Sequence, residues 1–225
     1  MSWTNPQNPN APVKGVDAMR VTASVFGAYG GALGMEHGFL EALQGNVATK
    51  GPRIMACSFE LPFPFGHEPA MTVIPNFLVT GIAALIAGLA IVVWSTAFVQ
   101  KRHGAVVLLL LSIVLLLVGG GFGPISVLIF ACIAASRIDK PMTRWGRWQP
   151  ASMCSVLGRL WGWLLVCAMF YVPGEFVVGQ VIGLRNDPRQ TLTNLNLMLT
   201  YPMLGLFAMT LVAALAQGTK ECPEV

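Results

Sequence analysis

The residues best suited to chemistry are two acids and a histidine inside one apolar segment. Glu36, His37 and Glu41 interrupt an apolar run that begins near Val21. Charged side chains are costly within a bilayer, so where they occur in membrane helices they commonly mark ion or substrate sites. Since no Lys or Arg lies deep in the apolar segments, these carboxylates must be protonated, reach water or hold a cation. The structural alternative is a neutral Glu36 bonded to a backbone carbonyl, with Glu41 reaching the membrane surface.

Helical spacing places several of these side chains on one stripe, because residues three and four positions apart share a helix face. Glu36 lies about 100° away from that stripe and is expected to face another neighbour. The stripe comprises Gly30, Gly34, His37, Glu41 and Gln44. Small residues allow a neighbouring helix to approach closely, and such packing is predicted at Gly27, Gly30, Gly31, Gly34 and Gly38.

Another acid follows a proline inside a later apolar run. Pro173 removes a backbone donor and Gly174 relaxes the helix, so the sequence predicts a kink or break there. Glu175 follows directly. Discontinuous membrane helices often frame ion and substrate sites, although a simple proline kink is the more common alternative.

The composition predicts a membrane protein. Of 225 residues, 55% are hydrophobic and 11% are charged, whereas soluble domains average about 25% charged residues. Lys and Arg fall between the apolar runs, which favours a topology signal over nucleic-acid binding. We predict a polar N-terminus at 1–19, one transmembrane helical domain at 20–217 with an outer loop at 45–70, and a tail at 218–225.

The fold class expected is an all-α, polytopic transmembrane bundle in the cell membrane. About 20 helical residues cross a bilayer, and four runs reach this length: Val21–Gln44, Met71–Val99, Val156–Leu184 and Leu192–Ala216. The uncharged stretch 105–136 would be ~48 Å long as one helix. Helix-breaking residues interrupt it at Gly119, Gly120, Gly121, Gly123 and Pro124. We therefore favour a hairpin of short helices at about 105–118 and 124–136, giving six helices, over one strongly tilted helix.

Cytoplasmic loops of membrane proteins carry an excess of Lys and Arg, and this bias also favours the hairpin. With the hairpin and both termini cytoplasmic, the cytoplasmic side holds Lys14, Arg20, Lys101, Arg102, Arg137, Lys140, Arg144, Arg147, Arg159 and Lys220. The outer side then holds only Lys50, Arg53, Arg185 and Arg189. A single straight helix would instead leave most of these cations outside.

In this topology the polar residues converge on the outer half of the bundle. The predicted binding zone comprises Glu36, His37, Glu41, Gln44, Glu175 and Asn196, with loop residues Glu60, His67 and Glu68 nearby. A metal site could be assembled only from His37, Glu41, His67 and Glu68, which form no recognised metal motif, so none is predicted. No catalytic residue or cofactor is assigned, because nucleotide and nucleophile motifs are lacking.

The function predicted from these residues is binding or transport of a small cation or a proton-coupled solute. Glu41 and Glu175 would accept the cation or proton, His37 would titrate with them, and Gln44 and Asn196 would orient the site. One alternative is a non-catalytic membrane subunit that packs its glycine groove against a partner helix or another copy of the chain. A second is a membrane-embedded enzyme that uses Glu and His as acid and base. The partner expected in every case is the lipid bilayer, and nucleic acid is not expected.

Overall fold

The computed structural model is mostly helical and describes residues 17–55, 69–138, 151–183 and 188–219. Within the last two ranges, the side chains of 151–155, 172, 175–176, 178–183, 188–200 and 218–219 lie outside the description. The described residues form six α-helices, as predicted: α1 Ala18–Leu43, α2 Phe77–Val93, α3 Gly104–Leu117, α4 Phe122–Ala135, α5 Ala151–Gly183 and α6 Pro188–Thr219. A π-helix, η1 (Trp94–Phe98), continues α2.

The stretch 105–136 forms the predicted hairpin of two short helices. α3 ends at Leu117 and α4 begins at Phe122. Gly119 and Gly121, between them, have φ angles of 96° and 74°, a backbone region that residues with a Cβ rarely adopt. The glycines therefore allow the chain to reverse within four residues.

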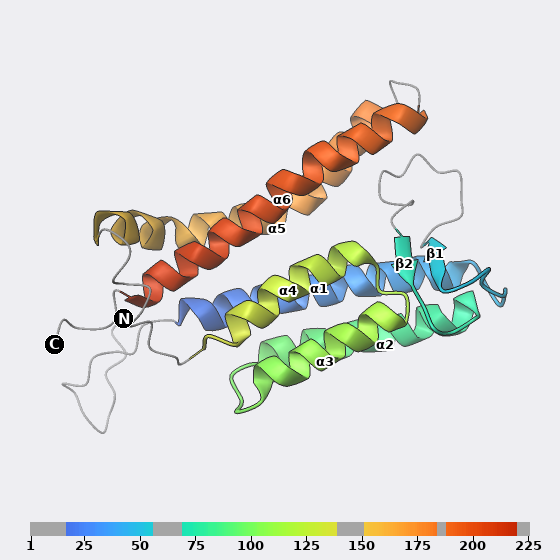
Figure 1. Ribbon diagram of the computed structural model, residues 1–225, viewed down its shortest axis with the longest axis horizontal. Coiled ribbons are helices and arrows are strands. Elements are labelled where there is room, and N and C mark those ends of the chain that lie inside the picture. The colour runs from blue at the N-terminus through green and yellow to red at the C-terminus, as the bar shows by residue number, and fades with distance from the viewer. Residues whose placement is uncertain (1–16, 56–68, 139–150, 184–187, 220–225) are drawn as a thin grey trace, which may run out of the picture.

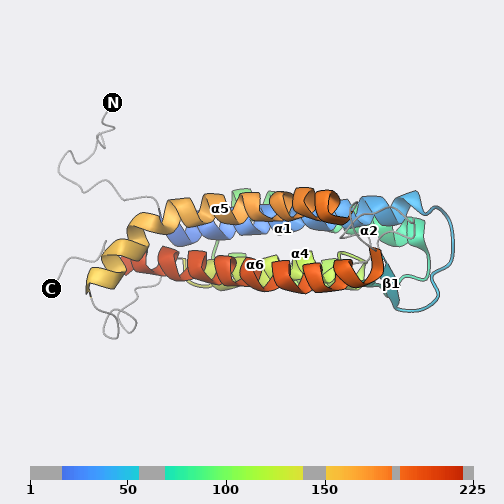
Figure 2. The same cartoon turned by 90° about the horizontal axis from the view of Figure 1, so that it is seen from above.

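The helices alternate in direction along the bundle, so consecutive helices are antiparallel (Figures 1 and 2). We call the end that holds the start of α1 and the end of α6 the proximal end. The distal end holds the α3–α4 turn and a two-stranded antiparallel hairpin, β1 (Arg53–Met55) and β2 (Pro69–Met71). The predicted topology likewise places these two groups of segments at opposite ends.

The predicted break at Pro173–Gly174 is wrong. α5 runs from Ala151 to Gly183 through both residues, and α6 likewise runs through Pro202. A proline removes only one backbone donor, and the remaining turns of a long helix stay hydrogen-bonded. Proline is tolerated in this way in helices with apolar surroundings.

Glycines bring α1 and α2 into direct backbone contact at two levels. A Cβ built on Gly31 would lie 2.8 Å from the Gly88 carbonyl oxygen, and one on Gly38 would lie 2.7 Å from that of Gly81. Gly30 meets Leu128 of α4, and Gly34 meets Leu115 of α3, in the same manner. The small-residue groove of α1 is thus filled by helices of its own chain.

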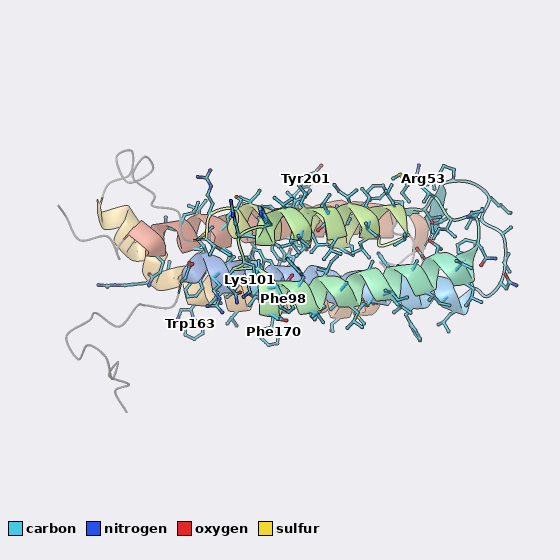
Figure 3. The ribbon with its side chains drawn as sticks, turned by 90° about the horizontal axis from the view of Figure 1, so that it is seen from below. Arg53, Phe98, Lys101, Trp163, Phe170 and Tyr201 are labelled. Atoms are coloured by element: carbon cyan, nitrogen blue, oxygen red, sulfur yellow. The ribbon has the colours of Figure 1, made fainter. Side chains whose placement is uncertain are left out.

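Large apolar side chains are exposed on the surface of the described bundle as well as buried in its core. Among the described residues, many large apolar side chains point outward on every helix, and Trp163, Phe170 and Tyr201 extend from the surface in Figure 3. The interior is mainly apolar as well, and the polar or charged side chains buried within it are Thr22, His37, Glu41, Thr72, Thr80, Ser95, Ser112 and Thr210.

By length and composition, one helix in the described part of the chain is long and apolar enough to cross a membrane. It is the 22-residue segment Phe77–Phe98, made of α2 and η1. Shorter apolar helical segments occur at Gly104–Leu117, Phe122–Ala135, Val156–Tyr171 and Tyr201–Gln217. α1 is long enough, but its glycines and charged residues lower its hydropathy.

Candidate functional site

Glu41 is the most unusual residue of the described structure. Its side chain is 0% exposed. Neither carboxylate oxygen has a hydrogen-bond partner within the described part of the chain. Both oxygens pack against Gly119 in the α3–α4 turn, at the place where a Cβ would stand in any other residue. An isolated carboxylate is strongly destabilised by the loss of water, so burial here disfavours the charged form of this side chain.

His37 lies one helical turn before Glu41 and is also buried, at 7% exposure. Its imidazole packs against Gly121 of the same turn, again in the space that a Cβ would occupy. His37 and Glu41 thus lie on the same face of α1, as helical spacing predicts, and both face the α3–α4 turn. The glycines of the hairpin, predicted only as helix breakers, also form the wall of this site.

Backbone hydrogen bonds hold the turn in place over Glu41. The Gly119 amide donates to the Met71 carbonyl at 2.9 Å, and the Val73 amide donates to the Leu117 carbonyl at 2.9 Å. Between them, Thr72 and Val118 form an antiparallel bridge. β2 and the two residues after it therefore pair with the turn through backbone hydrogen bonds. We call these residues, 69–73, the cap segment.

Hydrogen bonds of two buried threonines connect these paired segments to α2. The Thr80 hydroxyl donates to the Val118 carbonyl at 2.8 Å, and the Thr72 and Thr80 hydroxyls hydrogen-bond to each other. Thr80 is 0% and Thr72 is 2% exposed. Neither threonine was predicted from the sequence. Thr80 is a polar residue within the apolar run of α2, as His37 and Glu41 are in α1, and this feature could have indicated it.

Gln44 lies at the C-terminal end of α1, close to the cap segment. Its side-chain amide donates to the Met55 carbonyl of β1 at 3.1 Å. Because β1 pairs with β2, this bond ties α1 to the strand hairpin. Gln44, a member of the predicted zone, therefore anchors the distal end of α1 to the strand hairpin.

Of the remaining predicted site residues, the structure describes the surroundings of Glu36 alone. Glu36 is exposed on a different face of α1, as its helical offset predicted. Glu175 and Asn196 belong to α5 and α6, and their side chains lie outside the description. Glu60, His67 and Glu68 also lie outside the described residues. His37 and Glu41 are thus the acid and imidazole of the zone that the described structure brings to one turn.

The α5–α6 pair meets the other helices mainly toward the proximal end. There the Trp161 indole donates to the Thr22 hydroxyl at 2.9 Å, and the rings of Phe26 and Phe207 lie 4.7 Å apart. Toward the distal end the pair diverges from α1 and α4 (Figure 1). A Cβ built on Gly174 would have no neighbour within 4 Å. The distal part of α5 is therefore not packed against the Glu41 site.

The described residues contain no group of three or more His, Cys, Asp or Glu side chains that could hold a metal ion. Comparison of the chain with protein-family models, with curated proteins and with solved structures finds no match. Any function of this chain is therefore inferred from its own residues and their geometry.

Proposed function

We propose that this is a multi-pass integral membrane protein of the cell membrane, with both termini in the cytoplasm. The support is the exposure of many large apolar side chains on the described helices and the close packing of α1 and α2 through glycines. Lipid solvates apolar faces, and helices in it associate through small residues, as α1 and α2 do here. Arg20, Lys101, Arg102, Arg137 and Arg159 flank the proximal ends of the helices, which favours that end as cytoplasmic.

The function that we propose is binding of a small cation, with a proton as the simplest case, at Glu41, coupled to movement across the membrane or to a solute. One observation carries the proposal: a fully buried carboxylate without a hydrogen-bond partner in the described chain. Such a group must be neutral or be matched by a positive charge, because a lone carboxylate in an apolar interior costs far more than folding can supply.

The packing around Glu41 favours a proton over a metal cation. The carboxylate lies directly against the Gly119 backbone, and this close contact leaves no layer of water between them. A metal cation needs several oxygen ligands, whereas a proton needs only the carboxylate. His37, one turn away, is the nearest titratable group on the same helix face.

The proposal is tested by flux measurements in proteoliposomes that contain the purified protein. Glu41→Gln removes the acid and keeps the shape of the side chain, and Glu36→Gln makes the same change at an exposed position of the same helix. We expect pH- or ion-driven flux to be lost with Glu41→Gln and kept with Glu36→Gln. Glu175→Gln shows whether α5 contributes to the same pathway. Equal flux in the Glu41→Gln protein and the unmodified protein would contradict the mechanism.

The two alternatives gain no specific support. The glycine groove, which motivated a scaffold that receives a partner helix, is filled by α2, α3 and α4 of the same chain. An acid–base enzyme needs a substrate cavity beside its acid and base, whereas Glu41 and His37 pack directly against glycine backbone. Proton or cation binding requires neither a partner helix nor a cavity of that size.

A further inference from the structure

We infer that Thr72 and Thr80 form a latch that holds the glycine turn over Glu41 and so controls the access of protons or cations from the distal aqueous side. This inference rests on the proposed function of Glu41 and adds positioning residues to it. Figure 1 shows the strand hairpin beside the α3–α4 turn, at the distal end of the bundle.

The α3–α4 turn itself closes the site. Gly119 covers both Glu41 oxygens, and Gly121 covers the imidazole of His37. Neither glycine carries a side chain that could anchor the turn in the bundle. Its position over the acid therefore depends on its backbone hydrogen bonds, together with the packing of the Val118 side chain against the core.

The backbone of the α3–α4 turn is hydrogen-bonded to the cap segment, which lies outside α3 and α4. The Gly119 amide and the Leu117 carbonyl are both engaged by the cap segment, through Met71 and Val73. The Val118 carbonyl, between them, accepts from Thr80. The turn can move away from Glu41 only if these bonds are given up together.

The hydroxyl groups of Thr72 and Thr80 connect the α3–α4 turn to the cap segment. Thr80 belongs to α2, and it bonds both to the turn at Val118 and to the cap segment at Thr72. The Thr72 hydroxyl also accepts from the Ile74 amide at 3.0 Å. Both hydroxyls are buried, where hydrogen bonds are stronger and their loss is more costly than in water. Thr80 is thus the one described side chain that fixes turn and cap segment to the same helix.

The latch predicts that Glu41 becomes reachable from water when the two hydroxyls are removed. Accessibility can be measured with a water-soluble carbodiimide and a small amine, which together convert an accessible carboxyl group to an amide. The full-length protein is labelled in nanodiscs, and mass spectrometry of the peptide that carries both Glu36 and Glu41 gives the two rates separately. Glu36, five residues earlier on another face of α1, serves as the internal reference for how far the reagents reach to that depth of the helix.

In the Thr80→Val protein, which keeps the shape of the side chain, we expect the ratio of Glu41 to Glu36 labelling to rise about tenfold. This is the order expected when one or two hydrogen bonds that close a two-state element are lost. Thr72→Val should raise the ratio in the same direction, and it replaces Thr80→Val if that variant fails to fold. The matched control is Thr22→Val, which removes an equally buried hydroxyl that bonds another helix at the proximal end.

The inference is overturned if Thr80→Val and Thr72→Val leave the ratio unchanged, or if Thr22→Val raises it as much. The outcome is independent of the flux assay. Loss of flux in Glu41→Gln with unchanged labelling in the threonine variants would reject the latch and keep the acid site. Faster labelling with normal flux in Glu41→Gln would keep the latch and reject the role of the acid.

Discussion

The two halves of α1 both pack closely against neighbouring helices, but they differ in whether their buried polar side chains are hydrogen-bonded. Both halves use glycines to bring neighbouring helices close. In the proximal half, the buried Thr22 hydroxyl accepts from the Trp161 indole, and Phe26 packs on Phe207. In the distal half, buried Glu41 has no hydrogen-bond partner among the described residues. The proximal half pairs its buried Thr22 hydroxyl and leaves one neutral group, the Ser95 hydroxyl beside Gly27, without a partner in the described chain. The distal half instead keeps an acid whose environment destabilises its charge.

This difference indicates which half is built for stability and which for function. Buried polar groups are nearly always hydrogen-bonded, so an exception in an otherwise well-packed helix calls for an explanation. Sites that bind ions commonly sacrifice stability for activity. The proximal half, with its aromatic contacts, supplies a rigid base, and the distal half holds the acid under a turn that backbone and threonine bonds help to retain.

The largest effect on stability should come from the proximal half. Phe207 is fully buried between Phe26 and Phe130. Phe207→Ala should lower the free energy of unfolding in detergent by about 3–5 kcal/mol, as for other buried aromatic residues. Tyr201, on the distal part of α6, is 69% exposed, and Tyr201→Ala should change it by less than about 0.5 kcal/mol. Similar losses would show that the two halves of α6 are equally packed.

In the distal half, Gly119→Ala should be costly for two reasons that can be separated. A positive φ costs a residue with a Cβ about 1–2 kcal/mol, and the overlap with Glu41 adds about 1–3 kcal/mol. In a Glu41→Ala background only the first cost should remain. A double-mutant cycle in the free energy of unfolding measures the difference. Additive effects would mean that Gly119 and Glu41 are not in contact.

Substitution of Glu41 itself should have the opposite sign. Glu41→Met keeps most of the volume and removes the unpartnered carboxyl group, so we expect the free energy of unfolding to rise by about 1–3 kcal/mol. The same protein should lose pH- or ion-driven flux. A destabilised Glu41→Met protein would show that the carboxyl group is satisfied in the folded protein.

The smallest effect is expected at the matching position of the proximal half. Thr22→Val removes the acceptor of the Trp161 indole and should lower the free energy of unfolding by about 1 kcal/mol. Flux should be retained, since Thr22 lies far along α1 from Glu41. Thr22→Val is thus expected to lower the free energy of unfolding, and Glu41→Met is expected to raise it. Changes of the same sign in both proteins would contradict the contrast between the two halves.

Local sequence features predicted much of the helical architecture. The six helices follow from apolar runs, and the α3–α4 turn follows from Gly119 and Gly121, whose backbone preferences act locally. Gly123 and Pro124 were also expected to break the helix, but they lie in the first turn of α4, where proline is tolerated. The pairing of His37 with Glu41 follows from helical periodicity. Each of these features depends on residues that are close in sequence.

Features that depend on distant residues were not predicted. The cap segment reaches the α3–α4 turn through backbone amides and carbonyls, which every sequence provides. Thr80 meets Val118 only because two helices and a turn come together. The divergence of α5 and α6 from α1 and α4 toward the distal end depends on how the helices tilt, which helix spacing cannot show (Figure 1). Pro173 was expected to kink or break its helix, and α5 runs through it without a break.

The central claim is that Glu41 is a buried acid that binds and releases a proton. Infrared difference spectroscopy of the protein in lipid, recorded across a pH titration, measures this directly. We predict a carbonyl band of a protonated carboxylic acid near neutral pH that is absent in Glu41→Gln and retained in Glu36→Gln. A spectrum in which this band is missing from the unmodified protein, or unchanged in Glu41→Gln, would contradict the account.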